Sequence, residues 1–400
     1  MQTGRLTISM VCDFVFPNYG GVETHIMNIS LQLKELGHRI IIITHEYPGY
    51  LGKIFYKGIT IYYLKSAFLF RNTTLYTTFL HGPSFKKIYI SENINLVHGH
   101  QSSSPLSLEG IFHAQCLGIR TVFTEHSMFP ILPPLNLFLN TIIAQIIKRT
   151  DVKITVSQAC RKNLSGRLNI PPNEICLMRN SVDFNKFYPN FENQKENPSI
   201  INLIVITRFE ERKGVCILVK LIDLIFKKKN KYVLKIVGQG SLESFIEKHI
   251  KIQGMEDKIQ LLGPLDHSKI PFVLNSSDIF INTSLTESFC ISILEAAACG
   301  LKIVSTDVGG VREVLPRNMI YLTDIDAHSI YKGIKHVSGN INRFKARENH
   351  EILRKFDWRY VTLKLQKHYL RTFPPFNACS ILDYIFLLMQ IINIFMLKHF

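Results

Sequence analysis

The sequence lacks the cysteine patterns that define disulfide-rich or zinc-binding domains. Its eight cysteines, at positions 12, 116, 160, 176, 216, 290, 299 and 379, include no Cys-x-x-Cys pair and are too sparse for a small secreted scaffold. Several lie in apolar runs and are expected to be small core residues. The first seven residues lead directly into a predicted strand, with no apolar run of signal-peptide length. We therefore expect a reducing, cytosol-facing environment.

Acidic residues are scarce relative to basic ones. There are 31 Asp and Glu against 47 Lys and Arg, which gives a formal net charge of +16. Such a charge suits a nucleic acid, a membrane surface or an anionic substrate. The chain has no zinc-finger spacing, no RNP-like aromatic motif and no basic region followed by heptads, so we expect no nucleic-acid partner. The basic cluster at 227–231 is expected to be a solvated helix end.

Low-complexity tracts and short-period repeats are also missing. With 400 residues, 46% of them hydrophobic and 20% charged, the chain is predicted to be globular and to form two domains. Its first half alternates β-branched runs with helical patterns, which is typical of an α/β parallel sheet with crossover helices. A helix is expected at 22–36, with Gly37 as its C-terminal cap. The strands expected in this half are 7–12, 39–44, 59–64, 95–98, 120–124 and 152–156.

The polar stretch 190–199 interrupts this pattern and is the predicted domain boundary. The α/β pattern then restarts, which predicts a first domain over 1–190 and a second over 200–371, whose final helices could pack back on the first. Helices are expected in the second half near 215–228, 242–252 and 291–299. The strands expected there are 200–206, 232–237, 258–262, 278–282 and 302–305.

The end of the chain differs in kind. Residues 378–397 form a stretch of 20 in which only Ser380, Asp383, Gln390 and Asn393 are clearly polar, about the length of a membrane-spanning helix. Basic residues precede it, as expected on the cytoplasmic side of such a segment. We predict a transmembrane segment over 376–397; the alternative is a C-terminal helix packed on the protein surface. A second apolar stretch, 128–147, could face lipid, although burial in the first domain is the commoner fate of such a run.

Three sequence motifs follow predicted strands and could bind an anionic ligand. Gly20 and Gly21 lie between the first strand and its helix, where the backbone can approach a phosphate closely. The loop lacks the Gly-x-Gly-x-x-Gly pattern, which argues against a nicotinamide cofactor. Arg208 and Lys213 follow the first strand of the second half and suit a diphosphate. A plain turn and ordinary surface charges are the alternative interpretations of these two motifs.

The most specific motif is the segment Glu287–Glu295, which holds two carboxylates at a strand-to-helix junction. Eight residues correspond to about 80° around a helix, so the carboxylates are predicted to be neighbours without being superposed. That arrangement is a poor glycosidase acid/base pair, because such enzymes place their carboxylates on opposite sides of the bond that is cut. It suits acceptors for sugar and ribose hydroxyls, with the intervening loop amides on phosphate.

Together these motifs resemble a retaining GT-B glycosyltransferase of family 4. More narrowly, five stretches between Leu6 and Arg371 resemble the members of that family that begin glycosylphosphatidylinositol (GPI) anchor synthesis. These stretches are Met10–Phe14, Asn18–Ile26, Phe123–Ser127, Leu285–Cys290 and Val304–Val311. The resemblance implies a GT-B fold, in which two Rossmann-like parallel-sheet domains face a cleft, followed here by a C-terminal hydrophobic helix.

The resemblance also implies an activity and a location. It implies transfer of GlcNAc from UDP-GlcNAc to phosphatidylinositol, in a complex with other subunits on the cytosolic face of the endoplasmic reticulum membrane. Retention of configuration is ascribed in this family to same-face attack, with the departing phosphate taking the acceptor proton. Arginine and lysine take the place of a metal ion, so neither a metal nor a cofactor is expected.

By the same resemblance, individual residues acquire roles. Arg208 and Lys213 would bind the donor diphosphate, Glu287 the sugar and Glu295 the ribose, while His126 would lie near the transferred sugar. Gly20 and Gly21 would line the phosphate site. The remaining donor-binding candidates are Ser288, Phe289 and Cys290.

The sequence departs from the family pattern in two places. Cys290 stands where many members have glycine, and residues 179–183 replace a common Pro-Asn-x-Val-Asp segment, which leaves the local turn open. Three alternatives remain: another family 4 transferase moving mannose or glucose, an inactive scaffold subunit, and a Rossmann oxidoreductase. The oxidoreductase lacks its fingerprint, and the presence of Arg208, Lys213 and both carboxylates argues against the scaffold.

Overall fold

The computed structural model describes residues 4–17, 20–65, 81–129, 134–190, 200–227, 231–339 and 344–371. The chain divides into two compact units. The first unit holds the chain up to Met178 and again from Val361, and the second unit holds Arg179–Tyr360. The chain therefore returns to its first unit after completing the second.

The first unit is built on an eight-stranded sheet in the order β3-β4-β2-β1-β5-β6-β7-β8. All neighbouring strands are parallel except β3 and β4, which form an antiparallel hairpin at one edge. The strands are β1 (Thr7–Val11), β2 (Arg39–His45), β3 (Gly52–Tyr56), β4 (Ile59–Leu64), β5 (Leu96–His100), β6 (Arg120–Glu125), β7 (Val152–Thr155) and β8 (Ile175–Leu177).

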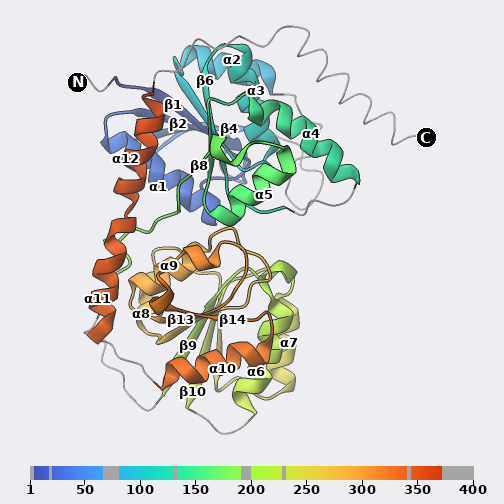
Figure 1. Ribbon diagram of the computed structural model, residues 1–400, viewed down its shortest axis with the longest axis vertical. Coiled ribbons are helices and arrows are strands. Elements are labelled where there is room, and N and C mark those ends of the chain that lie inside the picture. Colours follow the sequence, from blue (N-terminus) through green and yellow to red (C-terminus); the bar gives the residue numbers. More distant parts are fainter. Residues whose placement is uncertain are drawn as a thin grey trace. The chain divides into compact units, whose positions relative to one another are not determined.

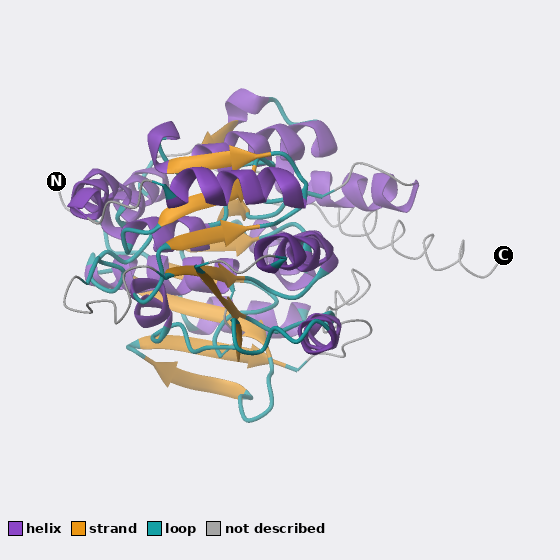
Figure 2. Ribbon diagram, turned by 90° about the horizontal axis from the view of Figure 1, so that it is seen from below, coloured by secondary structure: helices purple, strands orange, loops and turns teal. Residues whose placement is uncertain are grey.

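Helices accompany the strands of this unit, and the strands lie between helices in Figures 1 and 2. They are α1 (Gly21–Glu35), α2 (Gly82–Ser91), α3 (Pro105–Cys116), α4 (Pro134–Lys148), α5 (Gln158–Leu168), the 3-10 turn η1 (Pro172–Glu174) and the last helix, α12 (Trp358–Tyr369). Most of α12 belongs to the first unit, where the hydroxyl of Tyr369 lies 2.6 Å from His98 Nδ1 on β5.

The second unit has a six-stranded, wholly parallel sheet in the order β11-β10-β9-β12-β13-β14. The strands are β9 (Ile201–Ile206), β10 (Tyr232–Val237), β11 (Ile259–Gly263), β12 (Ile279–Asn282), β13 (Lys302–Thr306) and β14 (Ile320–Thr323). Counted within the unit, this is the doubly wound order 3-2-1-4-5-6, which reverses direction between β9 and β12. Ligands of such sheets bind beyond the carboxyl ends of the strands at this switch point.

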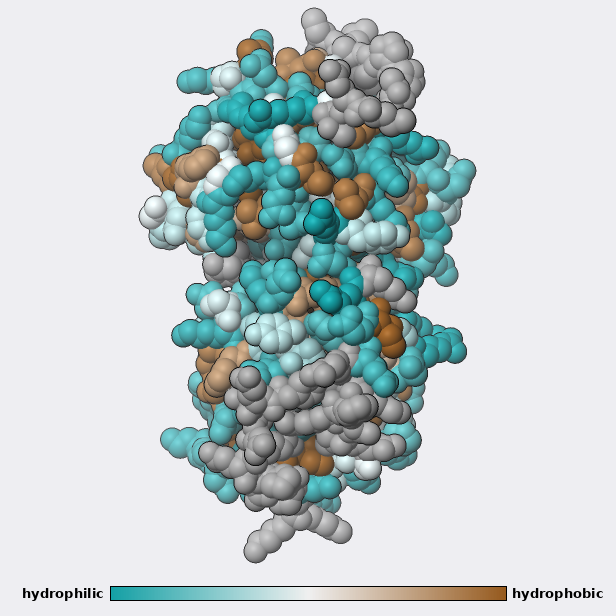
Figure 3. Space-filling model, turned by 90° about the vertical axis from the view of Figure 1, so that its left-hand side faces the viewer, coloured by the Kyte–Doolittle hydropathy of each residue, from teal (hydrophilic) through white to brown (hydrophobic). Residues whose placement is uncertain are grey.

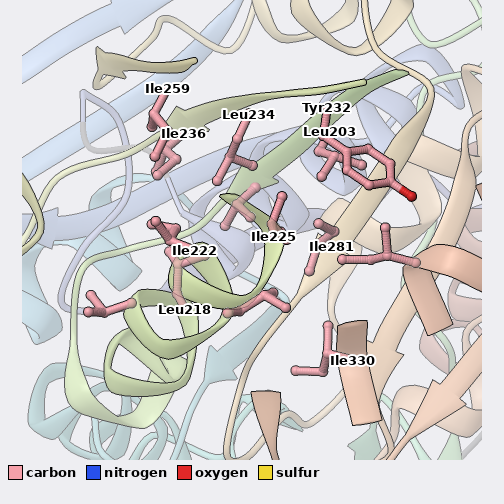
Figure 4. Close-up of a cluster of buried hydrophobic side chains, with 14 of the residues drawn as sticks. Leu203, Leu218, Ile222, Ile225, Tyr232, Leu234, Ile236, Ile259, Ile281 and Ile330 are labelled. Atoms are coloured by element: carbon pink, nitrogen blue, oxygen red, sulfur yellow. The ribbon is translucent and has the colours of Figure 1, made fainter. Parts of the chain in front are cut away.

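The helices of the second unit cover its sheet. They are α6 (Val215–Phe226), α7 (Glu243–Ile252), α8 (Ile270–Asn275), α9 (Ile291–Ala298), α10 (Ala327–Ser338) and α11 (Phe344–Leu353), with 3-10 turns η2 (Glu211–Lys213), η3 (Val311–Glu313), η4 (Arg317–Met319) and η5 (Arg354–Phe356). Figure 4 shows side chains of α6 and α10 meeting those of the strands in one buried cluster. Its members include Leu203 on β9, Leu218 and Ile222 on α6, and Ile330 on α10, all fully buried. Strands covered on both faces need continuous apolar runs, which is what β9 has.

The described half of the apolar stretch 128–147 is packed inside the first unit. Ile142, Ile143, Ile146 and Ile147 on α4 are all at most 5% exposed and lie in one core cluster with Leu164 of α5. Residues 130–133 of that stretch lie outside the described residues. For residues 140–147 the structure therefore favours burial over contact with lipid.

The predicted transmembrane segment 376–397 lies outside the described residues. Within the parts of the chain that the structure describes, no helix is long and apolar enough to cross a bilayer. Hydrophilic residues predominate on the face shown in Figure 3, where hydrophobic ones lie in small groups. Some large apolar side chains are exposed, among them Phe55 on β3 and Phe272 on α8. Single exposed apolar residues of this kind are common on soluble and membrane-associated domains alike.

Candidate active site

The strongest candidate site lies at the switch point of the second unit's sheet. Arg208 and Lys213 follow the carboxyl end of β9, and Glu287 follows the carboxyl end of β12. These two strands are neighbours at the point where the strand order reverses. The fold thus brings residues separated by more than 70 positions to one edge of the sheet.

Gly214 allows the two loops to pack against each other. It has φ +70° between η2 and α6, and a Cβ at this position would lie 1.9 Å from the carbonyl oxygen of Thr283. Only glycine fits such a contact. The hydroxyl of Thr283 donates to the carbonyl of Lys213 at 2.9 Å, and the Leu285 amide donates to the carbonyl of Arg212 at 2.9 Å. Backbone packing therefore fixes Lys213 beside the β12 loop.

Lys213 and Glu287 form an ion pair at this edge. Lys213 Nζ lies 2.5 Å from Glu287 Oε1, and the hydroxyl of Ser284 lies 2.8 Å from the same oxygen. Glu287 is 8% exposed, and its carbonyl accepts from the Gly310 amide at 2.9 Å. A buried carboxylate with these partners is held in one orientation. It is placed to accept further hydrogen bonds from a hydroxylated ligand.

Two arginines add positive charge next to this ion pair. Arg208 and Arg212 are both exposed, and they lie close enough for their charges to interact. Desolvation and the charge of Arg208 lower the pKa of Arg212, while Glu287 raises it. Like charges at close range are tolerated on a surface that binds an anion. Three cations thus surround one carboxylate at the switch point.

Glu295 lies on α9 and has a partner of its own. His267 Nε2 lies 2.8 Å from Glu295 Oε1, and the imidazole of His267 packs against the ring of Phe187. Burial lowers the pKa of His267, but the contact with Glu295 outweighs it, so the pKa is raised above its usual value. Glu295 is 7% exposed. The two carboxylates of the motif therefore sit in different hydrogen-bond networks, one with a lysine and one with a histidine.

The residues between these carboxylates form the turn into α9. Phe289 is 1% exposed and anchors the turn in the core, whereas Ser288 and Cys290 are half-buried. Cys290 is the residue before the helix and has φ +75°, ψ +80°, a conformation that favours glycine. Burial and the charge of Glu287 raise the pKa of its thiol to about 12, so the thiol is protonated at neutral pH.

The first unit has its own candidate cluster at the carboxyl ends of β1, β5 and β6. Gly20 and Gly21 begin α1, with Gly20 extended at φ −166°, and His25 lies one turn into that helix. His100 ends β5 and His126 directly follows β6. His100 Nδ1 lies 3.1 Å from His126 Nε2, and the ring of His126 lies edge-on to that of His25 with centroids 4.5 Å apart.

All three histidines are buried. Burial holds the pKa values of His100 and His126 well below their usual range, and the neighbouring imidazoles lower them further. At neutral pH these side chains are therefore uncharged and can exchange hydrogen bonds with a hydroxylated ligand.

These three histidines are also the group in the described chain with metal-ligand chemistry. One ring nitrogen of each lies within 4.8 Å of the others. Tetrahedral zinc with bonds of about 2.0–2.1 Å needs nitrogens closer than this, roughly 3.3 Å apart. The residue types fit a cation, and the spacing would have to contract.

Sequence reasoning missed several residues of these clusters. It named Arg208, Lys213 and both carboxylates, but not Arg212, Ser284 or His267. Arg212 carried a signal, since it precedes Lys213 in the same loop. His267 carried none, because it follows β11 and meets Glu295 only through the fold. His25 and His100 also lie in separate motifs that meet only at the sheet edge.

Comparisons with known proteins agree with this architecture. The chain superposes on sucrose-phosphate synthase from Thermosynechococcus elongatus with a TM-score of 0.76 over 91% of this chain and 98% of that one, at 18% identity. It superposes on the Anabaena protein Alr3699/HepE, solved with UDP and glucose, with a TM-score of 0.73 over 91% of this chain and 99% of that one, at 16% identity. A sequence model described as Glycosyltransferase Family 4 matches residues 19–186, and one described as Glycosyl transferases group 1 matches 187–349. The chain is a glycosyltransferase with the GT-B fold.

Curated relatives narrow the family. The human protein PIG-A, named for phosphatidylinositol N-acetylglucosaminyltransferase, is 34% identical over 92% of this chain and 77% of its own length. Its Arabidopsis thaliana namesake is 34% identical over 93% of this chain and 83% of its own length. The GPI3 subunit of the Saccharomyces cerevisiae transferase is 33% identical over 88% of this chain and 80% of its own length. The chain belongs to this PIG-A/GPI3 family, which confirms the narrower resemblance.

Proposed function

We propose that this chain transfers N-acetylglucosamine from UDP-GlcNAc to phosphatidylinositol with retention of configuration, the first step of GPI-anchor synthesis. The observation that carries the proposal is the similarity to relatives named for this reaction, which extends over about nine-tenths of the chain and through both units. The cation cluster at the switch point of the second unit is consistent with it, because a nucleoside diphosphate becomes more negative as its bond to the sugar breaks.

Within the second unit, we assign the donor to the residues around the Lys213–Glu287 pair. Arg208 and Lys213 bind the diphosphate, Glu287 accepts hydrogen bonds from the sugar and Glu295 from the ribose. The turn of Ser288, Phe289 and Cys290 offers its amides at the start of α9, where a helix favours anions. In the first unit, Gly20 and Gly21 contribute to the phosphate site.

We assign His126 to the neighbourhood of the transferred sugar. Its buried, neutral imidazole can hold a hydroxyl group without introducing a charge that would compete with the diphosphate. The departing phosphate takes the acceptor proton, so the proposal requires no dedicated protein base.

We expect no metal in this reaction, because the cations of the second unit take its place. Activity should then survive EDTA unchanged. Loss of activity with EDTA and its return with a divalent cation would contradict this expectation and would direct attention to His25, His100 and His126.

The partners and location follow from the same proposal. The chain acts with other subunits on the cytosolic face of the endoplasmic reticulum membrane, anchored by a single segment at 376–397. Basic residues precede that segment, and a net charge of +16 favours a surface rich in anionic phosphatidylinositol. Removal of residues 376–400 should release the chain from carbonate-washed membranes. Unchanged retention would argue against the anchor.

The experiment that tests the function uses microsomes that contain the chain and its partner subunits. They should convert UDP-GlcNAc and phosphatidylinositol to GlcNAc-phosphatidylinositol, and Lys213→Ala or Glu295→Ala should abolish the conversion. Lys220→Ala on α6 and Glu247→Ala on α7 are matched controls, since both side chains are exposed and belong to the same unit. Full activity in the first pair would overturn the site assignment.

Two further outcomes separate the alternatives. Product formed only from a mannose or glucose nucleotide would identify a different family 4 transferase. Unchanged GlcNAc transfer in microsomes that lack the chain but keep its partners would identify a scaffold subunit.

A further inference from the structure

A buried ion pair lies directly beneath the histidine cluster of the first unit. The carboxylate of Glu125, the last residue of β6, is fully buried, and its Oε2 accepts from Arg167 Nη2 of α5 at 2.8 Å. The Arg167 side chain is only 4% exposed. Glu125 immediately precedes His126 in the chain, yet neither Glu125 nor Arg167 has a role in the donor and sugar contacts proposed above.

The second carboxylate oxygen holds the backbone of two loops. Glu125 Oε1 accepts from the amide of His126 at 3.1 Å, from that of Ser127 at 3.3 Å and from that of Ser102 at 3.3 Å. Ser102 belongs to the loop after β5, which also carries His100 at the strand end. One carboxylate therefore ties the loop after β5 to the loop after β6.

Arg167 completes the same network from the other side. Its Nη2 also donates to the hydroxyl of Ser102 at 2.7 Å, and its Nη1 donates to Asn140 Oδ1 of α4 at 3.3 Å. The guanidinium lies over the ring of Phe129, 4.9 Å from the ring centroid. The arginine is thereby fixed by two helices and by the loop that follows His126.

Stability alone is a weak reason for such a pair. The cost of removing two charges from water often exceeds their attraction, and apolar residues of similar size can stabilise a core as well. What the pair supplies is a single backbone geometry at Ser102, His126 and Ser127. That geometry determines where the imidazoles of His100 and His126 lie.

We propose that Glu125 and Arg167 are positioning residues, which act on the transfer reaction by fixing the loop that carries His126. Neither touches the substrate in this proposal. It rests on the role proposed for His126, so its test must distinguish failure of that role from failure of the positioning effect.

The test is a double-mutant cycle in the complete complex. Glu125→Gln keeps the shape of the side chain and removes its charge, and should lower kcat roughly 10- to 100-fold, as misplacement by about 1 Å does. The KM for UDP-GlcNAc should stay within about twofold, because the donor is assigned mainly to the second unit. In a His126→Ala background, Glu125→Gln should have little further effect on the residual rate, because both changes act through the same group.

A matched control comes from another buried carboxylate in the same unit. Glu92 is 5% exposed and pairs with Arg39 and Lys53. Arg39 begins β2, so this pair lies at the amino ends of the strands, opposite the edge that carries His126. Glu92→Gln should leave kcat within about twofold of the unaltered complex, whatever it does to stability.

The outcomes are distinguishable. A wild-type kcat in Glu125→Gln would overturn the inference, and so would an equal loss in the His126→Ala background, since that indicates a general structural effect. Full activity in His126→Ala would overturn the role of His126 and this inference together. If Glu125→Gln does not assemble into the complex, Arg167→Lys serves the same cycle, because it keeps the charge but not the fork that joins Glu125 to Ser102.

Discussion

Cys290 combines a conformation that favours glycine with a position at the start of the donor-side helix. Its φ of +75° is strained for a side chain with a Cβ, and more so for a β-branched one. Cys290→Gly should therefore be tolerated, whereas Cys290→Val should lower the free energy of unfolding by about 1–2 kcal/mol. The valine variant should also raise the KM for the donor, because the turn carries Ser288 and Phe289. Chemical denaturation and steady-state kinetics measure both effects.

A matched control is Cys299→Val at the end of the same helix. Cys299 is also buried, but it has φ −78°, which any residue adopts. Equal destabilisation at both positions would mean that side-chain size, and not backbone conformation, limits position 290.

The buried histidines of the first unit predict a defined pH dependence of stability. His98, His100 and His126 have pKa values held well below the usual value, first by burial and then by neighbouring imidazoles. In the unfolded chain they titrate near their usual pKa of about 6.5, so below that pH the unfolded state binds more protons. The free energy of unfolding should therefore fall on acidification, by up to about 1.4 kcal/mol per pH unit for each histidine.

Native-state hydrogen exchange between about pH 7.5 and 5.5, a window that spans the usual histidine pKa, resolves the two units separately once intrinsic rates are corrected for. His267 in the second unit gives the opposite sign, because Glu295 raises its pKa and its contribution is lost as pH rises through that value. A first unit that becomes more stable on acidification would contradict the prediction.

At this scale, sequence reasoning found residues that lie within a recognisable motif and missed those that meet by folding. Arg208, Lys213 and Glu287 follow strands and could be named from order along the chain. His267 meets Glu295 across 28 positions, and Arg167 meets Glu125 across 42, with no local pattern to indicate either contact. The conformation of Cys290 was likewise invisible, since only the departure from glycine marked the position.

At the scale of elements, the loop from β9 to α6 depends on Gly214. Gly214→Ala adds a Cβ 1.9 Å from the carbonyl oxygen of Thr283, so the loop has to move away from the β12 end. Because that movement separates Lys213 from Glu287, donor binding should fall by at least about tenfold, and the unit should lose more than about 1 kcal/mol. Isothermal titration with UDP and thermal denaturation measure the two effects.

Gly254→Ala is the control for this change. Gly254 has φ +61° in the same unit, with nothing within 4 Å of the methyl group that alanine would add, so it bears the cost of backbone strain without the collision. Its alanine variant should lose about 1 kcal/mol and bind UDP normally. Similar UDP binding in both variants would show that the packing of Gly214 on Thr283 does not hold the site.

Elements with continuous β-branched runs were predicted closely. The strand expected at 59–64 matches β4, and those expected at 232–237 and 302–305 match β10 and β13 to within one residue. The hairpin of β3 and β4 was missed, because the alternation expected for parallel strands gives no place to an antiparallel edge. Its turn, Lys57 and Gly58, has two positive φ values, as a two-residue hairpin requires, but lacks the Asn-Gly or Asp-Gly signature.

At the scale of the whole molecule, the chain visits its first unit twice. The sequence boundary predicted at 190–199 follows a change in composition, whereas the compact units divide at Met178 and again at Tyr360. Composition marks a polar linker, but it cannot show that a later helix packs back on an earlier sheet. In α12 that return is carried by Gln366, which bonds to His38, and by Tyr369, which bonds to His98.

The return of α12 makes the stability of the first unit depend on a residue near the end of the described chain. Tyr369 is fully buried, and its hydroxyl lies 2.6 Å from Nδ1 of His98, whose Nε2 lies 2.7 Å from Thr124 Oγ1. Tyr369→Phe leaves a buried ring nitrogen of His98 without this partner, which costs about 1–3 kcal/mol. Hydrogen exchange should show that loss in the strands of the first unit, with the second unit unchanged.

Tyr56→Phe is the matched control, since Tyr56 lies in the same unit and its ring stacks on Phe16. It should leave exchange in both units within about 0.5 kcal/mol of the unaltered protein. Because the ring of His98 also packs against that of His100, with centroids 4.1 Å apart, Tyr369→Phe should lower the transfer rate as well. An equal loss of protection in both units would contradict the assignment of α12 to the first unit, because the two sheets would then unfold as one.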